Sequence, residues 1–302
     1  MPNILRATFL GCLVALMAGC ESTRWNWLKR DPNTQLAGKP GAAPNVRAVV
    51  DYLNENAKRM RTLQVNDLDV DASMGAQSFN LRGRIYAEKP KNFRMKVTLF
   101  GKEEVDIGSN SREFWFWALK NPEKHQYFCS YQDLQAGRVK AMPLPLQPEW
   151  VMEALGLGPY GPADKYKLET DGQFLKLIET SKSPQGKAVR KVIVMHRREM
   201  KAPQPQVTAF LLLDDLSGQE ICSAHITSTT VDRVKGVILP HRMELRVPAQ
   251  QMTMKLRLDG VTVDGQILGT AFARPQMSGV QPFNLATGQV EPWGAQRTGG
   301  FR

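Results

Sequence analysis

Residues 79–131 have the sequence FNLRGRIYAEKPKNFRMKVTLFGKEEVDIGSNSREFWFWALKNPEKHQYFCSY, and this stretch decides the fold. Apolar and polar side chains alternate along it, most regularly where Phe93, Met95, Val97 and Leu99 are separated by single polar residues. Alternation with a period of two is typical of a strand that buries one face. Short runs containing Gly, Pro or Asn separate the alternating segments, as turns do. The stretch therefore predicts a meander of antiparallel strands whose apolar face must be covered.

The second half of the chain continues this pattern. Alternating or apolar runs occupy residues 166–169, 174–178, 189–196, 207–213, 221–227, 237–247 and 252–263, with turn residues between or within them. Together with a strand at 68–72, these runs give about a dozen strands in one sheet, more than an open twisted sheet tolerates without curling. We therefore expect a mainly β (α+β) fold, built on a large antiparallel curved sheet or half-barrel.

Two helices are predicted beside the sheet. The first follows Asn45, whose side chain can cap it, and its apolar residues recur at spacings of three and four. These apolar residues are Val46, Val49, Val50, Leu53, Ala57, Met60 and Leu63. The second is a short apolar helix that starts at Pro148 and ends before Gly156. Two interpretations of this short helix remain open: it plugs the core, or it is a movable lid over a cavity.

The N-terminus has the features of an export signal. Residues 1–19 contain one basic residue, Arg6, and an apolar run that is too short to span a bilayer permanently. The end of this segment, Leu16-Met-Ala-Gly-Cys20, resembles the bacterial lipobox, which implies that Cys20 is acylated and takes up palmitate in cells. Residues 20–44 are rich in Gly, Pro and small side chains and are predicted to form a flexible tether.

The chain is strongly basic, with a formal net charge of +11 and a pI near 9.6. Removal of residues 1–19 leaves +10, because Arg6 is the only charged residue lost. In an exported protein such a charge favours anionic membrane surfaces or lipopolysaccharide over nucleic acid. A lipid anchor contributes about 0.8 kcal/mol per buried methylene and each nearby basic residue about 1 kcal/mol, so we expect firm attachment to a membrane and no nucleic acid partner.

The sequence offers no catalytic or metal-binding motif. The four histidines, His125, His196, His225 and His241, lie on separate segments, and the sequence has no His-x-x-x-His, no Cys-x-x-Cys and no carboxylates clustered at metal-ligand spacing. Residues 156–161 match G-x-G-x-x-G, but they follow a helix and Pro159 lacks the amide that a phosphate would need. We therefore predict no enzyme activity, no metal and no cofactor. A hydrolase would require His125, His225 or His241 to meet carboxylates in a cleft.

Two cysteines, Cys129 and Cys222, remain once Cys20 is acylated. A disulfide is one possibility in an oxidising compartment, but both residues lie in predicted strands far apart in the sequence. Two buried free thiols are the other possibility. The aromatic run Phe114 to Trp117 presents aromatic side chains on both faces of one strand, so one face is expected in the core and the other beside a hydrophobic pocket.

Several local features together resemble the LolA/LolB-like superfamily of lipoprotein carriers and sorting proteins. They are the lipidated N-terminus, the leading amphipathic helix, Pro90-Lys-Asn-Phe-Arg94, Ile107-Gly108 before an aromatic strand, Val237-Ile-Leu-Pro240 and Phe272-Ala-Arg-Pro275. The resemblance covers residues 45–275, which we assign to one domain, and residues 276–302 are predicted to be a disordered tail. It implies an antiparallel half-barrel with helices closing its concave side, and a hollow that accepts acyl chains.

The expected function is that of a membrane-anchored envelope lipoprotein that binds acyl chains of lipids or lipoproteins and serves transport or sorting. The predicted ligand cavity is lined by Leu81, Ile85, Phe93, Met95, Val97, Leu99, Phe114, Phe116, Trp150, Val151, Met152 and Leu155. The alternative is a structural or interaction lipoprotein with a filled core and no ligand. Glu21, where an Asp would resemble a signal for inner-membrane retention, favours the outer membrane, facing the periplasm. A monomer is expected.

Overall fold

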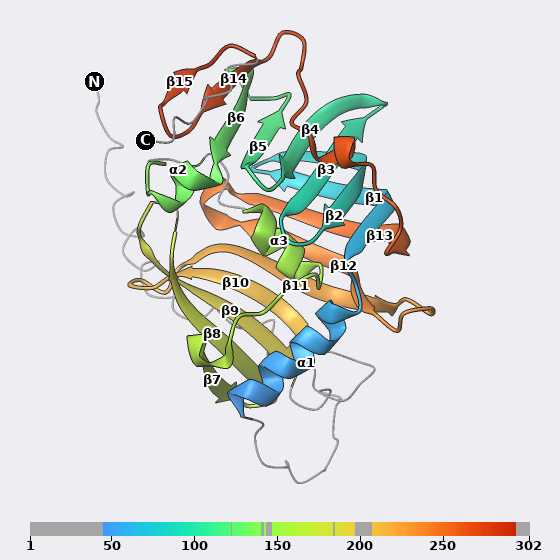
Figure 1. Ribbon diagram of the computed structural model, residues 1–302, viewed down its shortest axis with the longest axis vertical. Coiled ribbons are helices and arrows are strands. Elements are labelled where there is room, and N and C mark those ends of the chain that lie inside the picture. Colours follow the sequence, from blue (N-terminus) through green and yellow to red (C-terminus); the bar gives the residue numbers. More distant parts are fainter. Residues whose placement is uncertain are drawn as a thin grey trace, which may run out of the picture. The chain divides into compact units, whose positions relative to one another are not determined.

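The computed structural model describes residues 45–121, 123–139, 142, 147–183, 185–196 and 207–293, all of them in one compact unit. These residues form one sheet of fifteen strands (Figure 1). The strands of the first half are β1 (Thr62–Met74), β2 (Gln77–Glu88), β3 (Asn92–Leu99), β4 (Lys102–Ser109), β5 (Glu113–Ala118) and β6 (His125–Ser130). Those of the second half are β7 (Tyr166–Asp171), β8 (Phe174–Lys182), β9 (Ala188–His196), β10 (Val207–Asp214), β11 (Glu220–Val231), β12 (Ile238–Val247), β13 (Met252–Val263), β14 (Gln281–Asn284) and β15 (Gln289–Val290).

The sheet consists of two meanders joined side by side. Its strand order is β15-β14-β6-β5-β4-β3-β2-β1-β13-β12-β11-β10-β9-β8-β7. All neighbours are antiparallel except β14, which runs parallel to β6. The junction is the pair β1 and β13, in which Leu63 lies opposite Val263 and Met74 opposite Met252. The prediction of one large antiparallel sheet is therefore confirmed except for the parallel pair of β14 and β6. The sequence pattern did not indicate β14 and β15.

Helix α1 (Val46–Lys58) lies against the second meander (Figure 1). The Asn45 side chain caps it as predicted, accepting a hydrogen bond from the Ala48 amide at 2.8 Å. The helix ends two residues before Met60, so Met60 and Leu63 of the predicted stripe are buried in the following turn and in β1 instead. The Asn56 amide group donates to and accepts from the Ile238 backbone, both at 2.9 Å, and fixes α1 on β12.

Among the described residues, two further α-helices and three short 3₁₀ segments connect the strands. Helix α2 (Tyr131–Gln135) was not predicted, whereas α3 (Pro148–Ala154) matches the predicted short apolar helix. The backbone of Gly156 has a φ of +87°, a conformation that favours glycine, and its amide bonds to the Glu153 carbonyl at 2.9 Å. Gly156 thus ends α3 as predicted. The 3₁₀ segments are η1 (Ala163–Lys165), η3 (Pro248–Gln250) and η4 (Gly269–Phe272).

The C-terminal region is more ordered than its composition predicted. Residues 264–280, here called the C-terminal strap, follow β13 and lead past η4 to β14 (Figure 1). The prediction of a disordered tail is therefore wrong for residues 276–293, while residues 294–302 lie outside the described part of the chain. The reason is packing: the Phe283 ring contacts the rings of His125 and Tyr127 at centroid distances of 5.2 and 5.5 Å, which holds β14 on β6.

Residues 1–44, with the predicted signal peptide, Cys20 and the tether, also lie outside the described part of the chain. Among the residues that are described, no helix is long and apolar enough to cross a bilayer. The main core joins α1, α3 and one face of the sheet, which we call the inner face. The opposite face is called the outer face.

The β3–β4 hairpin tip gives a stability prediction. Phe100 and Gly101 form a two-residue turn in which both residues have positive φ, 49° and 78°. Asn-Gly suits such a turn, whereas a bulky side chain is disfavoured there, and the Phe100 side chain is 97% exposed. We expect Phe100→Asn to raise the free energy of unfolding by about 0.5–1 kcal/mol in urea denaturation, because it removes this conformational cost. Phe100→Leu is the control, and an equal gain in both variants would contradict the explanation.

Candidate functional site

The eight strand residues predicted to line a cavity all lie on the inner face of the sheet. The register places Ile85 opposite Met95, Met95 opposite Ile107, and Ile107 opposite Phe116. Because alternate residues of a strand share a face, the other predicted residues of β2, β3 and β5 point the same way. Their ligand-binding role remains a prediction. Four of them, Ile85, Phe93, Met95 and Val97, belong to the packed core. Leu81 and Phe116 are partly buried against this core, Phe114 packs in a separate small cluster, and Leu99 is half-buried outside both.

Helix α3 occupies the centre of the inner face. Its four predicted cavity residues, Trp150, Val151, Met152 and Leu155, are all buried in the main core. The space between α3 and the strands that carry Ile85, Phe93 and Met95 has a volume of only about 10 Å³. This is room for about one water molecule, so α3 plugs this part of the hollow in the described conformation. Of these four residues, only Trp150 also lines a larger space.

That larger space is a groove of about 550 Å³ at the end of the inner face where β8–β9, β10–β11 and β12–β13 turn. The apolar residues that line it include Trp150 from α3, Val189 from β9, Leu212 from β10 and Val247 from β12. Lys182, Lys187 and Lys191 also line it, together with Asp214 and Glu220. A volume of this size lies within the range of small-molecule sites, and the lining combines an apolar floor with a few polar groups. The groove is therefore the candidate functional site.

A carboxyl group on α3 lies beside this groove. Glu153 shares a small cleft with Glu179 of β8 and Lys191 of β9, between α3 and the inner face. Loss of hydration in this cleft raises the pKa of Glu153 to about 7, with attraction to Lys191 opposing the rise and repulsion from Glu179 and Glu149 adding to it. The helix is therefore held on the sheet by a contact that includes a group titrating near neutral pH.

Both cysteines of the described region are free thiols, and both are buried. Cys222 lies on the inner face within the main core, whereas Cys129 packs with Phe114 and Tyr131 in the small cluster. Burial raises the pKa of each thiol to about 12, which keeps them protonated and unreactive. Of the two alternatives left open by the sequence, the structure has the pair of free thiols.

The outer face of β3–β5 is closed by the C-terminal strap. The Arg94 guanidinium forms an ion pair with Asp106 at 2.7 Å and donates to the Ala271 carbonyl of the strap at 3.0 Å. The Trp115 indole N–H donates to the same Asp106 carboxylate at 3.0 Å, and Asp106 and Trp115 are fully buried. The pocket expected on the second face of the aromatic strand is therefore replaced by this buried cluster around Trp115.

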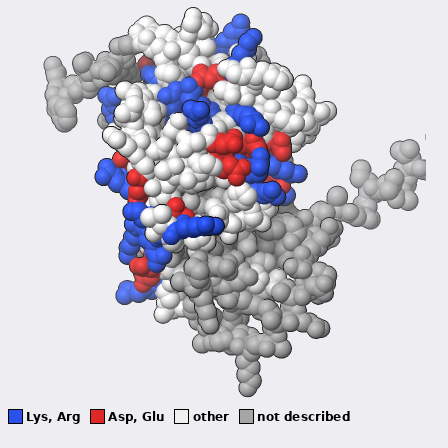
Figure 2. All heavy atoms as spheres, turned by 90° about the vertical axis from the view of Figure 1, so that its right-hand side faces the viewer, with Lys and Arg blue, Asp and Glu red and all other residues white. Residues whose placement is uncertain are grey.

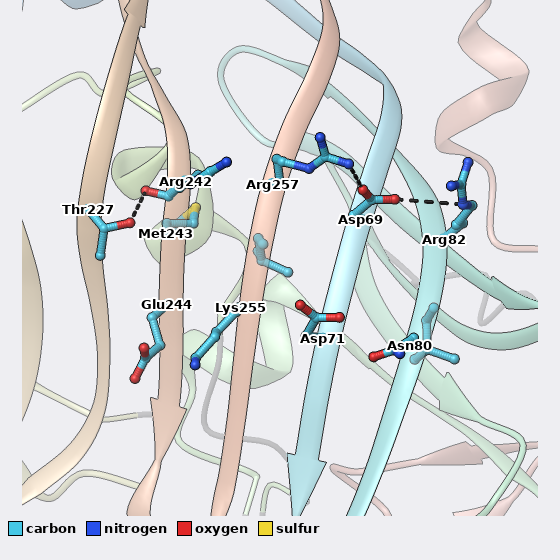
Figure 3. A pocket seen from close by; sticks show the side chains of 12 residues that line it. Asp69, Asp71, Asn80, Arg82, Thr227, Arg242, Met243, Glu244, Lys255 and Arg257 are labelled. Atoms are coloured by element: carbon cyan, nitrogen blue, oxygen red, sulfur yellow. Dashed lines mark hydrogen bonds and ion pairs between the residues drawn. The ribbon is translucent and has the colours of Figure 1, made fainter.

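A trough of about 710 Å³ lies on the outer face across β11, β12, β13, β1 and β2. Figure 3 views these strands from the side opposite α3 and shows charged side chains of both signs projecting into the trough. Asp69 bridges two arginines, because it forms ion pairs with Arg257 of β13 and, at 3.7 Å, with Arg82 of β2. Figure 2, which views the molecule from the right-hand side of Figure 1, also shows basic and acidic side chains beside one another. This open trough, with its charged lining, does not suit a hydrocarbon chain.

The described histidines do not assemble a catalytic cleft. His225 is buried, with its Nε2 2.9 Å from the Oγ of the fully buried Ser223. His241 is partly exposed on the outer side of the sheet, where its Nε2 lies 3.2 Å from Asp259 and its Nδ1 3.5 Å from Ser228. Neither of these two histidines, nor His125, lines the groove or the trough. No cluster of three or more His, Cys, Asp or Glu with metal-ligand spacing occurs among the described residues.

The sequence missed most of the groove. Val189, Leu212 and Val247 were recognised as strand residues, but the pattern did not show which alternate set faces inward at the end of each strand. The lysines at the β8–β9 turn were missed because charged turn residues are ordinarily solvated. One feature of the sequence could have indicated the groove. The alternating apolar residues of β9, β10 and β12 continue to the ends of these strands that lie at the turns.

No family model matches the sequence, and no curated protein sequence matches it. Solved structures resemble it at low identity. They include a DUF1329 family protein from Desulfovibrio piger, with 10% identity, a TM-score of 0.48 and coverage of 76% of this chain and 97% of that one. A domain named for outer membrane lipoprotein sorting, from Vibrio parahaemolyticus, has 9% identity and a TM-score of 0.47, and the match covers 74% of this chain and 95% of that one. A LolA superfamily protein from Nitrosomonas europaea has 10% identity and a TM-score of 0.46, and the match covers 77% of this chain and 99% of that one.

Proposed function

We propose that this protein is an envelope lipoprotein that binds the acyl chains of lipids or lipoproteins on the inner face of its sheet and serves their transport or sorting. The observation that carries the proposal is the groove of about 550 Å³ beside Trp150, which opens onto the apolar inner face. Burial of roughly ten methylenes gives on the order of 8 kcal/mol before ordering and desolvation losses, which is enough for a carrier. No covalent step is needed.

Attachment to the membrane belongs to the same proposal. The lipobox-like sequence that ends at Cys20 supports acylation of this cysteine, and the basic charge of the chain supports contact with an anionic bilayer surface. Glu21 supports the outer membrane as the location. An anchored protein is better suited to receive acyl chains at a membrane than to shuttle them between membranes.

The proposal is tested by narrowing the groove. Leu212 is on the inner face, opposite Lys191 of β9, and it is only half-buried, so a larger side chain there projects into the groove. We expect Leu212→Trp, in the full chain carrying Cys20→Ser, to bind a fluorescent fatty acid at least tenfold more weakly than the same chain without it. Leu213→Trp is the matched control, because Leu213 is half-buried on the outer face and its replacement leaves the groove unchanged.

A second function is favoured by a different observation. The spaces enclosed directly beneath α3 are about 10 Å³ each, as in a protein with a filled core. A structural or interaction lipoprotein would use the same fold with no ligand. The binding experiment decides between the two, because failure of the parent chain to bind any acyl probe would support the filled-core function and refute the carrier.

A further inference from the structure

The groove beside α3 has a chemical asymmetry between its floor and its rim. Val189 and Val247 are fully buried, and Trp150 and Leu212 complete an apolar floor. Lys182 and Lys187, which flank the β8–β9 turn, are exposed at its rim. A hydrocarbon chain lying on the floor would therefore place its polar end near these two lysines.

Within the described part of the chain, neither Lys182 nor Lys187 forms an ion pair at contact distance. Lys187 does attract the Asp214 carboxylate, and this attraction contributes to lowering the pKa of Asp214. Two carboxylates also line the groove, but each is engaged elsewhere. Asp214 accepts hydrogen bonds from the Ser217 amide and hydroxyl at 2.7 and 2.8 Å within the β10–β11 turn. Glu220 accepts a hydrogen bond at 2.6 Å from the hydroxyl of Ser223, which is on the outer face.

The third lysine extends the basic rim toward the floor. Lys191 is half-buried, and it lies next to Glu153 and Glu179 in the cleft under α3. These two carboxylates partly balance the charge of the Lys191 ammonium group. Substitution of Lys191 would therefore test the binding of an anionic head less cleanly. Lys182 and Lys187 lie outside this cleft.

We propose that the groove selects amphiphiles with an anionic head, such as a carboxylate or a phosphate, over neutral ones of equal chain length. The inference rests on the proposed acyl-chain binding, because the chain on the floor is what brings the head to the lysines. Attraction by two ammonium groups at a partly exposed site is screened by salt, so the selectivity falls as ionic strength rises. The same head chemistry occurs in free fatty acids and in phosphate-bearing lipids.

The experiment uses three probes with the same twelve-carbon chain, dodecanoate, dodecyl phosphate and dodecanol, below the concentration of micelle formation. Each displaces a fluorescent acyl probe from the full chain carrying Cys20→Ser. We expect at least one anionic probe to bind tenfold or more tightly than dodecanol at 50 mM salt, and this ratio to shrink at 500 mM. A preference for the carboxylate identifies free fatty acids as the source of the head, and a preference for the phosphate identifies phosphate-bearing lipids.

A double variant tests whether Lys182 and Lys187 cause the preference for anionic probes. Lys182→Gln with Lys187→Gln is expected to reduce the ratio to about twofold or less. The matched control is Lys102→Gln with Lys120→Gln, two exposed lysines at turns of the other meander, which should retain the full ratio. Equal binding of all three probes, or a ratio that survives in the first variant, would overturn the charge selectivity while the carrier function stands. Binding of no probe at all would overturn the carrier function itself.

Discussion

Replacement of Arg94 by alanine is expected to lower the free energy of unfolding by about 3–5 kcal/mol, the largest effect of any single substitution proposed for this protein. Asp106, its partner at 2.7 Å, is fully buried and would be left as an uncompensated charge beneath the C-terminal strap. The strap would also lose the hydrogen bond from Arg94 to the Ala271 carbonyl. Urea denaturation measures the free energy, and limited proteolysis within residues 264–280 measures the release of the strap.

The matched control is Arg82→Ala on the same face of the sheet. Arg82 approaches Asp69 at 3.7 Å, but its side chain is 77% exposed, so water replaces the lost contact and the cost is below about 1 kcal/mol. A double variant, Arg94→Met with Asp106→Leu, removes both charges and should recover part of the stability lost by Arg94→Ala. Recovery is incomplete because the buried Trp115 N–H then loses its acceptor. If Arg94→Ala costs no more than Arg82→Ala, the buried ion pair does not hold the strap.

Glu153→Gln is expected to make the protein more stable than the parent chain at pH 8, by up to about 3 kcal/mol, and to change its stability little at pH 4.5. The pKa of Glu153 is raised from its ordinary value of 4.5 to about 7, because the cleft beside Trp150 removes water from the carboxylate. Between pH 4.5 and 7 the folded state therefore holds a proton that the unfolded state has released. The free energy of unfolding falls as the pH rises through this window and then levels off.

The measurement is urea denaturation of both proteins at several pH values between 4.5 and 8. Because all other titrating groups are common to the two proteins, the difference between their curves isolates Glu153. Glu55→Gln, at an exposed position of α1, serves as the control and should run parallel to the parent. Parallel curves for Glu153→Gln as well would show that the carboxylate under α3 is hydrated. If the fall in stability between pH 4.5 and 7 is absent from Glu153→Gln, the attachment of α3 in the parent chain weakens as the pH rises to neutral.

Local patterns in the sequence predicted the elements of this fold well. The alternation of Phe93, Met95, Val97 and Leu99 fixed both a strand and its inward set, because neighbouring side chains of a strand point to opposite faces. The spacing of apolar residues after Asn45 predicted α1, and Pro148 with Gly156 bounded α3. These features depend on residues close together in the sequence, which is why they could be predicted from it.

Features that depend on distant partners could not be predicted in this way. Arg94 occupies the polar phase of its strand, which ordinarily faces water, and it becomes buried only because the strap arrives from residues 264–280. The hollow expected on the inner face is largely filled by α3, because four of its side chains pack there. The groove was missed for the same reason, since its lining comes from α3 and from strands β8 to β12.

The pairing of β1 with β13 also governs when the chain can fold during synthesis. Leu63 finds its partner Val263 only after most of the polypeptide has left the ribosome. Until then the first meander ends at an open edge, and pairings between residues so far apart form slowly. A nascent or prematurely truncated chain therefore exposes the unpaired backbone of β1, so a newly made polypeptide needs protection from self-association until its last strands emerge.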